Sequence, residues 1–297
     1  MRIFGSNVMN DFFDTDLKEI VNKYYSSFQN LNEGDAGTRF KSWEYCHQFF
    51  LDNKDKFKGK FKDGVLVKNE DLTSEQKSIR DLMALHLGFY LASWGMYRGS
   101  SFLLNRDYKA HLKAVDIILE PKYESLWNFN PTDEETIDSV YKLLFGDPHR
   151  KSDNKNDCGI YWRIKEDAYR SISIQDCNLS LSHNSSSKDS VPTDTLVTKI
   201  LLGTFACIPA FDRFFEKGVR FCNKKVPKEE KISSNLESNP QRTFKAISKF
   251  ALTHSDSINS LINDENFEGL KDYPVMKIVD MYFWQKGYDA PSSNGNI

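Results

Sequence analysis

Apolar residues recur along most of this chain at the three-to-four-residue spacing of amphipathic α-helices. Residues 11–30 repeat apolar side chains at this spacing from Phe12 to Tyr24, and residues 38–52 gather aromatic side chains on one side. The last third of the chain continues the pattern. It predicts helices over residues 194–206, 212–223, 240–252, 256–263 and 275–286.

Two further helices carry recognisable start signals. The sequence TSEQ, Thr73 to Gln76, is a capping box that precedes a long helix containing LHLGFYLASWGMYRGSS. Glycines at positions 95 and 99 lie four residues apart, which predicts a bare helix face for close packing of a neighbour. The sequence PTDEETIDSVYKLLFG predicts a second capped helix, from Asp133 to about Phe145.

The middle of the chain is different in character. The segments 146–159 and 180–194 are polar and rich in turn-forming residues, which predicts loops. The sequence YWRIKEDAYRSIS between them has no clear type. We find no internal repeat and no strand pair, so we predict an all-α, multi-helix globular fold. We expect a helical N-terminal or cap region over 1–179 and a second helical region over 190–290, packed as one unit.

Composition excludes several classes of protein. Of 297 residues, 39% are hydrophobic and 13% aromatic, which is ample for a core and excludes a disordered chain. The net charge is −2, so any nucleic-acid or membrane surface must be local. The most apolar run, Leu82 to Tyr97, has 16 residues, whereas a membrane span needs roughly 20. We therefore expect a buried central helix and no membrane partner.

Cysteines and histidines form no recognisable site. The five cysteines are widely spaced without a CxxC pair, and the six histidines form no HxxxH or HxH pair. Nucleotide-binding glycine motifs and the GxSxG elbow are also missing. No secretory leader pattern opens the sequence. We therefore expect a cytoplasmic protein with no metal and no cofactor, and a monomer rather than an oligomer.

One acid stands at an unusual place, after the apolar run in TKILLGTFACIPAFDRFFEKG. Pro209 ends the run, and Asp212 follows where the next helix begins. One hypothesis is structural: Asp212 is the N-cap of that helix. The other is chemical: a carboxylate walled by Phe211, Phe214 and Phe215 is fixed in place and stabilises a sugar cation or orients a water for attack on an anomeric carbon.

This segment resembles the helix-hairpin-helix DNA glycosylases. In that superfamily a hairpin leads into a buried helix, and a Pro-containing turn then leads to the catalytic aspartate at the start of the next helix. LVTKILLGTF is similar to the buried helix, ACIPAF to the turn and Asp212 to the aspartate. YPVMKIVDMYFWQKG is similar in character to the closing helix of the family. The resemblance covers about thirty residues around Asp212, and the first 180 residues carry no motif of the family.

The sequence departs from the family in two places. SVPTDT, Ser190 to Thr195, stands where the hairpin has a Gly-x-Gly turn that holds a DNA phosphate. Here Pro192 removes an amide and Asp194 adds a negative charge. The Schiff-base lysine of bifunctional members would fall near Thr195, one helical turn before Lys199. The resemblance therefore implies a monofunctional enzyme, which leaves an abasic site without cutting the strand.

Charge and aromatic residues suggest contacts for DNA. Between residues 213 and 231 the chain has seven basic residues against three acidic ones, which is typical either of a phosphate-facing surface or of an ordinary solvated face. At the end of the long helix, Trp94, Tyr97 and Arg98 either line a cleft or belong to the core and its edge. With Phe211 and Phe214 they are our candidates for binding the substrate. The candidates for DNA-phosphate contact are Lys199, Arg213, Lys217, Arg220, Lys224 and Lys225.

The resemblance thus implies a monofunctional DNA glycosylase with Asp212 as the catalytic carboxylate and DNA as the partner. It would extrude a modified base and hydrolyse the N-glycosidic bond. The long N-terminal region suggests a cap that enlarges the base pocket for a bulky base, such as one from bacteriophage DNA, and hence a role in antiviral defence. Two alternatives stay open: a helical protein-interaction module, and a nucleic-acid-binding module without catalysis.

Overall fold

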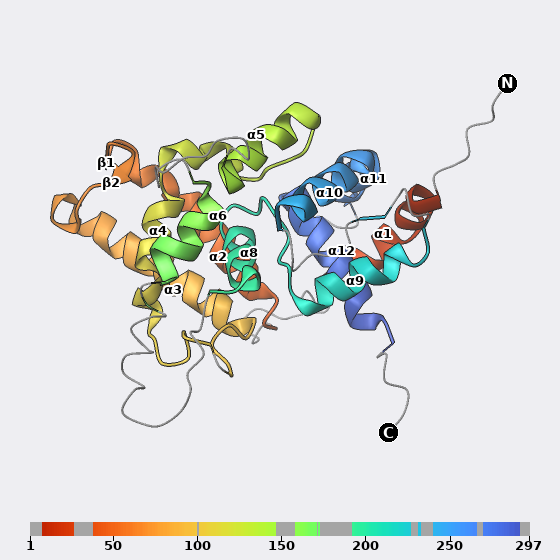
Figure 1. Cartoon of the computed structure of the whole chain (residues 1–297), viewed down its shortest axis with the longest axis horizontal. Coiled ribbons are helices and arrows are strands. Elements are labelled where there is room, and N and C mark those ends of the chain that lie inside the picture. The colour runs from red at the N-terminus through yellow and green to blue at the C-terminus, as the bar shows by residue number, and fades with distance from the viewer. Residues whose placement is uncertain are drawn as a thin grey trace.

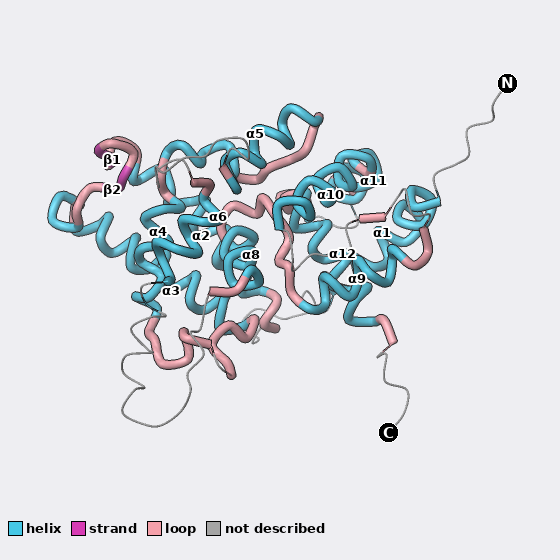
Figure 2. The backbone as a smooth tube through the Cα atoms, viewed as in Figure 1, coloured by secondary structure: helices cyan, strands magenta, loops and turns pink. Residues whose placement is uncertain are grey.

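The protein is all-α, as its hydrophobic pattern predicts (Figures 1 and 2). The computed structural model describes residues 8–26, 38–99, 101–146, 158–170, 172, 192–226, 231–232, 240–265 and 270–291. The α-helices within these ranges are α1 (Val8–Ser26), α2 (Lys41–Asn53), α3 (Ser74–Ser93), α4 (Leu112–Ile118), α5 (Glu134–Phe145), α6 (Ile160–Trp162), α8 (Asp194–Gly203), α9 (Arg213–Asn223), α10 (Pro240–Thr253), α11 (Ser255–Ile262) and α12 (Val275–Asp289). Shorter helical turns are η1 (Lys54–Phe57), η2 (Asn69–Asp71), η3 (Tyr108–His111), η4 (Pro121–Leu126) and the π-helical η6 (Arg163–Arg170).

The order of the helices in space differs from their order in the chain. In Figure 1, α2 to α6 and α8 lie on one side of the molecule, and α9 to α12 lie on the other. The first helix, α1, packs on α12 and α11, and its Asp16 accepts a hydrogen bond from the hydroxyl of Tyr282 at 2.8 Å. The chain crosses from one side to the other between α8 and α9. The division of the chain into regions 1–179 and 190–290 stays a prediction. The N-terminal helix α1 lies with the last helices of the chain.

Both predicted helix starts are confirmed. The hydroxyl of Thr73 accepts a hydrogen bond from the amide of Gln76, and the Gln76 side chain accepts one from the amide of Thr73, which completes the capping box. Asp133 caps α5 by accepting a hydrogen bond from the amide of Thr136 at 2.7 Å. These local signals work because the capping groups lie within one turn of the amides they satisfy.

The predicted glycine face of the long helix is wrong. Helix α3 ends at Ser93, and Gly95 follows with a φ of +78°. The amides of Met96 and Gly95 donate to the carbonyls of Leu91 and Ala92, both at 2.9 Å, which is the Schellman ending that favours glycine. Gly95 therefore stops the helix instead of clearing a face of it, and Gly99 lies beyond the helix end.

A short hairpin departs from the expectation of no strand pair. Strands β1 (Phe61–Lys62) and β2 (Val65–Leu66) pair antiparallel around Asp63 and Gly64, which both have positive φ. An Asp-Gly pair with this geometry is the preferred turn of two-residue hairpins. Figure 2 shows this hairpin at the edge of the molecule, remote from α9 and α12.

The segment of unclear type is helical. Helix α6 runs directly into the π-helical η6, and this pair buries Ile160, Tyr161 and Tyr169. The guanidinium of Arg163 forms an ion pair with Glu120, whose side chain is buried. The flanking loops predicted at 146–159 and 180–194 fall almost wholly outside the described residues.

The most apolar run forms one face of the core rather than a fully buried helix. Met83, Leu87 and Leu91 of α3 are buried, whereas Leu82 and Phe89 are exposed. The C-terminal end of α8 approaches α3 closely, because a Cβ on Gly203 would lie 2.4 Å from the ring of Tyr90. Among the described residues, no helix combines the length and the apolar character that crossing a membrane requires.

Candidate active site

The loop between α8 and α9 is held in one shape by three side chains. The hydroxyl of Thr198 accepts a hydrogen bond from the amide of Phe211 at 3.0 Å, and the hydroxyl of Thr195 donates to the carbonyl of Phe211 at 2.9 Å. From α12, Asp280 accepts a hydrogen bond from the amide of Ala210 at 3.1 Å. The residues just before Asp212 are therefore held by hydrogen bonds from α8 and from α12.

Asp212 is the N-cap of α9, so the structural hypothesis for this residue is confirmed. Its Oδ1 accepts hydrogen bonds from the amides of Phe214 at 3.0 Å and Phe215 at 3.1 Å. These are two of the amides that a helix leaves without a partner at its start. The cap does not exclude a chemical role, because the same hydrogen bonds hold the carboxylate in a fixed orientation.

The other carboxylate oxygen of Asp212 is paired with a buried lysine. Nζ of Lys199 lies 2.9 Å from Oδ2, and the Lys199 side chain is 3% exposed while that of Asp212 is 13% exposed. Nζ also lies 4.7 Å from the centre of the Trp94 ring, a cation–π distance. Lys199 thus lies inside the molecule against Asp212, apart from the surface where the other basic candidates lie.

The Asp212 carboxyl group is ionised at neutral pH. Burial on its own raises its pKa, but the charge and hydrogen bond of Lys199 and the amides of Phe214 and Phe215 outweigh burial. The net pKa of Asp212 is therefore lower than that of an ordinary aspartate. A carboxylate holds about four acceptor positions, and the two amides and Lys199 occupy three of them. One acceptor position remains on the partly exposed group.

A second buried ion pair lies behind this loop, on α12. Nζ of Lys277 lies 3.0 Å from Oδ2 of Asp280, and both side chains are nearly inaccessible. Nζ of Lys277 also donates to the hydroxyl of Tyr24 at 3.3 Å. Burial, together with the charges of Asp280 and Asp212, raises the pKa of Tyr24 well above its usual value, so this hydroxyl stays protonated.

Helices α9 and α12 cross at two glycines. A Cβ on Gly218 would lie 1.8 Å from the carbonyl oxygen of Phe283, and one on Gly287 would lie 1.8 Å from the carbonyl oxygen of Phe214. No side chain fits at either position. This crossing places the start of α9, and with it Asp212, against the last two turns of α12.

Aromatic rings gather beside Asp212 from four parts of the chain. Trp94 ends α3, Phe40 precedes α2, Phe214 lies in the first turn of α9, and Trp284 comes from α12. The ring of Trp284 lies 5.8 Å from Trp94, 5.6 Å from Phe40 and 5.1 Å from Phe214. Two of the predicted substrate-binding residues, Trp94 and Phe214, are thus brought together at the carboxylate.

The other three substrate-binding candidates lie differently. Phe211 is buried and stacks on Phe215 at 5.7 Å. The hydroxyl of Tyr97 is hydrogen-bonded to Nε2 of His111 at 2.6 Å. Arg98 is exposed, with its guanidinium folded over Gly95. Tyr97 is therefore held by the α3–α4 side of the molecule, which the sequence did not indicate.

The basic candidates on α9 are on the surface, with different partners. Arg213, Lys224 and Lys225 are exposed. Nζ of Lys217 donates to the carbonyl of Ala290 at 2.5 Å, and Arg220 pairs with the buried Glu216 at 3.3 Å. The helix thus presents a basic surface, while two of its cations are engaged within the protein.

Four residues at this cluster of rings were not among the candidates from the sequence: Phe40, Trp284, Tyr288, which stacks on Trp284, and Arg39, which lies over the ring of Trp94. Trp284 and Tyr288 lie in or next to the segment that resembles the closing helix, and that resemblance carried the only available signal. Arg39 and Phe40 come from far away in the chain, and no local pattern connects them to Asp212.

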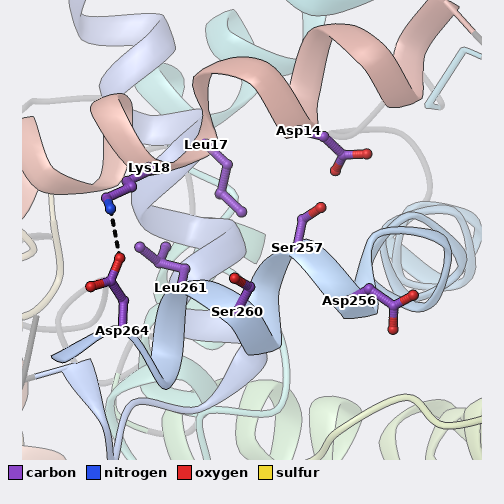
Figure 3. Close-up of a pocket in the computed structure, with 8 residues that line it drawn as sticks. All are labelled: Asp14, Leu17, Lys18, Asp256, Ser257, Ser260, Leu261 and Asp264. Atoms are coloured by element: carbon purple, nitrogen blue, oxygen red, sulfur yellow. Dashed lines mark hydrogen bonds and ion pairs between the residues drawn. The ribbon is translucent and has the colours of Figure 1, made fainter.

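A separate hollow of about 390 Å³ lies between α1 and α11 (Figure 3). Its lining is polar and acidic, and the Lys18–Asp264 ion pair, with Nζ 2.6 Å from Oδ2, closes one side of it. Among the described residues, no three His, Cys, Asp or Glu side chains are arranged to hold a metal ion, in this hollow or elsewhere. Its lining residues are Asp14, Leu17, Lys18, Asp256, Ser257, Ser260, Leu261 and Asp264.

Comparison with known proteins gives no relative on which to base a function. No protein-family model, no curated protein and no solved structure matches this chain significantly. The geometry around Asp212 and the resemblance of the segment that contains it are therefore the only guides to function.

Proposed function

We propose that this protein is a monofunctional DNA glycosylase in which Asp212 is the catalytic carboxylate. The observation that supports the proposal is the state of this group. It is ionised, held by two backbone amides and a lysine, partly exposed, and bordered by aromatic rings. A carboxylate held in this way needs little reorganisation when positive charge develops in front of it.

In the proposed reaction, a base leaves the stack and lies between aromatic side chains beside Asp212. The bond between the anomeric carbon and the base nitrogen breaks, and its electron pair leaves with the base, which takes up a proton. Asp212 stabilises the sugar cation and, through its remaining acceptor position, orients a water whose oxygen bonds to the anomeric carbon. The water releases a proton to solvent, which balances the proton that the base takes up from solvent. The products are the free base and an abasic site.

The Lys199–Asp212 pair favours a monofunctional enzyme. An amine must have a free electron pair to form a Schiff base, and the ammonium of Lys199 is engaged in an ion pair at 2.9 Å. We expect no covalent lysine–DNA adduct when borohydride is added during the reaction. Trp94, which precedes α8 in the chain, contacts the lysine that pairs with Asp212, and Phe40 contacts Trp94. These contacts support a cap formed by the N-terminal region and a bulky modified base, such as one in phage DNA, as substrate.

The test is the formation of alkali-labile sites without added metal. The substrates are ordinary DNA, deaminated or alkylated DNA, and DNA from phages with hypermodified bases, each in single-stranded and duplex form. Asp212→Asn alone is an imperfect control, because asparagine keeps the cap but leaves the buried Lys199 without its counter-ion. The double variant Lys199→Met/Asp212→Asn keeps the cap and buries no unpaired charge, so it is the matched control.

We expect wild-type protein to form abasic sites and both Asp212 variants to lose this activity at least about a hundredfold, as for other electrostatic catalytic groups. Abasic sites formed equally by the double variant would remove Asp212 from the mechanism. No abasic sites on any substrate would refute the proposed function.

The alternative that the geometry also favours is a module without catalysis, in which Asp212 serves only as the cap of α9. The two amide hydrogen bonds are sufficient reason for an aspartate at this position. In that case the folded double variant should behave as the wild type does in every binding assay.

A further inference from the structure

The aromatic rings beside Asp212 continue to the surface at the end of α12. The ring of Trp284 lies edge-on to Trp94 at 5.8 Å and stacks on Tyr288 at 5.2 Å, with an angle of 11° between the two planes. Phe214 contacts the edges of both Trp284 and Tyr288. We call Trp94, Trp284 and Tyr288 the aromatic row. It runs from Trp94, which contacts the lysine paired with Asp212, to the exposed Tyr288.

Tyr288 is open on the side that faces away from Trp284. Its ring uses one face to stack on Trp284, yet the residue is 57% exposed, the largest value among the exposed large hydrophobic residues of the described chain. A free aromatic face of this kind is a surface on which an unpaired base can stack.

Two exposed cations flank the aromatic row. The guanidinium of Arg39 lies 5.3 Å from the ring centre of Trp94, and that of Arg213 lies 4.6 Å from the ring centre of Phe214. Alternation of aromatic rings with arginines is the arrangement with which proteins hold single strands, in which rings stack on bases and cations neutralise the backbone.

The two indole groups of the aromatic row add an independent observation. Neither Nε1 of Trp94 nor Nε1 of Trp284 has a hydrogen-bond acceptor within the described structure, although both atoms are buried and Trp284 is only 3% exposed. A buried N–H without an acceptor is unfavourable.

The phosphate contacts expected for a duplex are weak here. In the segment before α8, Thr193 uses its hydroxyl to cap the amide of Leu196, and Asp194 pairs with Lys165 at 2.6 Å, so this turn offers no anion cradle. On α9, Lys217 and Arg220 are engaged within the protein. The exposed Arg39 and Arg213 lie beside the rings, so the phosphate contacts that remain are next to the surface on which bases would stack.

We propose that the aromatic row binds unpaired bases of single-stranded DNA, with Tyr288 stacking on a base next to the one at Asp212. Single-stranded or locally opened DNA is then the form on which the protein acts. This inference rests on the proposed function for DNA as the ligand. It adds the strand preference and a binding residue, Tyr288, that is distant from Asp212 in the chain.

The experiment measures the binding of a labelled mixed-sequence 20-nucleotide DNA by fluorescence anisotropy, as a single strand, as a duplex and as the RNA of the same sequence. The variants are Tyr288→Ala, Tyr288→Phe and, as matched control, Tyr45→Ala, which removes a tyrosine of α2 that is 53% exposed. Stacking on one base contributes enough that its loss should weaken single-strand binding about 5- to 100-fold. Tyr288→Phe keeps the ring and should bind as the wild type does, and so should Tyr45→Ala.

Three results would overturn the inference: a duplex bound as tightly as the single strand, RNA bound more tightly than DNA, or unchanged binding by Tyr288→Ala. Failure of the proposed function has a different signature. Single-strand binding that depends on Tyr288, without base excision from any substrate, would refute the glycosylase and leave the binding site. Excision from duplex DNA that Tyr288→Ala does not affect would leave the glycosylase and remove the binding site.

Discussion

Two buried lysine–aspartate pairs lie on opposite sides of the α8–α9 loop, and their construction differs. Lys199 and Asp212 come from separate helices, and the carboxylate is 13% exposed. Lys277 and Asp280 lie three residues apart on α12, and both are 5% exposed or less. The separations are nearly equal, 2.9 and 3.0 Å, so the distance between the charges does not distinguish the two pairs.

What distinguishes them is access. Taking two charges out of water costs several kcal/mol, so a buried pair is poor evidence for stability in itself. Asp280 uses its oxygens for Lys277 and for the amide of Ala210, and solvent does not reach it. Its role is to hold the loop. Asp212 keeps an acceptor position and is 13% exposed, so the same pair of residue types has a geometry that allows chemistry.

The largest effect should follow from breaking the sealed pair. Asp280→Asn leaves the buried ammonium of Lys277 without its counter-ion, and we predict a loss of about 3–5 kcal/mol in the free energy of unfolding. Urea denaturation followed by circular dichroism measures it. The double variant Lys277→Met/Asp280→Asn buries no charge and should recover most of the loss. A loss below about 1 kcal/mol in the single variant would mean that Lys277 reaches water or another anion.

The second-largest effect should come from filling the space where α9 and α12 cross at Gly218 and Gly287. Gly287→Ala places a Cβ 1.8 Å from the carbonyl oxygen of Phe214, so α9 must move away from α12. We predict a loss of about 3 kcal/mol by overpacking. Gly88→Ala is the matched control: it is also a helical glycine, but its Cβ would lie 3.3 Å from the nearest side-chain atoms. Helix propensity alone favours alanine over glycine, so an equal loss in both variants would show that filling any buried helical glycine, and not the crossing, decides the result.

The sequence predicted the parts of the fold that depend on neighbours in the chain. Thr73 and Asp133 were found as helix starts, and Asp212 as an N-cap, because each bonds amides two or three residues away. Gly95 was misinterpreted, since glycine favours both close packing and helix ends, and the pattern does not separate these uses. The Asp63–Gly64 hairpin carried a turn signal that a run of only two residues on each side made easy to overlook.

The site was less predictable, because its partners come from distant helices. Lys199 was placed on the DNA-facing surface as one of several cations, whereas the fold turns it inward to Asp212. A lysine on an apolar helix that ends near a buried acid is a signal for such a pair, but the direction of the side chain depends on how α9 packs. Phe40 has no local signal, since it precedes α2 and meets Trp284 of α12 only in the folded protein.

A smaller effect is expected when the accessible pair is broken. Asp212→Asn keeps both cap hydrogen bonds, Lys199 keeps its contact with the Trp94 ring, and the side chain at position 212 is 13% exposed. We predict a loss of about 1–2 kcal/mol, less than for Asp280→Asn, measured in the same urea titration. Lys199→Met/Asp212→Asn should be as stable as the wild type within about 1 kcal/mol. A loss equal to that of Asp280→Asn would show that Asp212 is sealed as well, and would weaken the case for chemistry.

The smallest predicted effect is the loss of stability at low pH that comes from the Asp212 carboxyl group alone. The pKa of Asp212 is lowered in the folded state, so its contribution to stability is present above the unfolded pKa near 3.8 and is lost as the pH falls through the lower folded value. The wild type should therefore lose its advantage over Asp212→Asn below about pH 4. Burial lowers the pKa of His111 to about 3, so both proteins lose stability between pH 6.5 and 3 for that reason. The two proteins share this loss, and it cancels in the difference between their unfolding free energies, measured from pH 7 to 3. A difference that does not change with pH would mean that the carboxylate contributes through the shape of its hydrogen bonds and not through its charge.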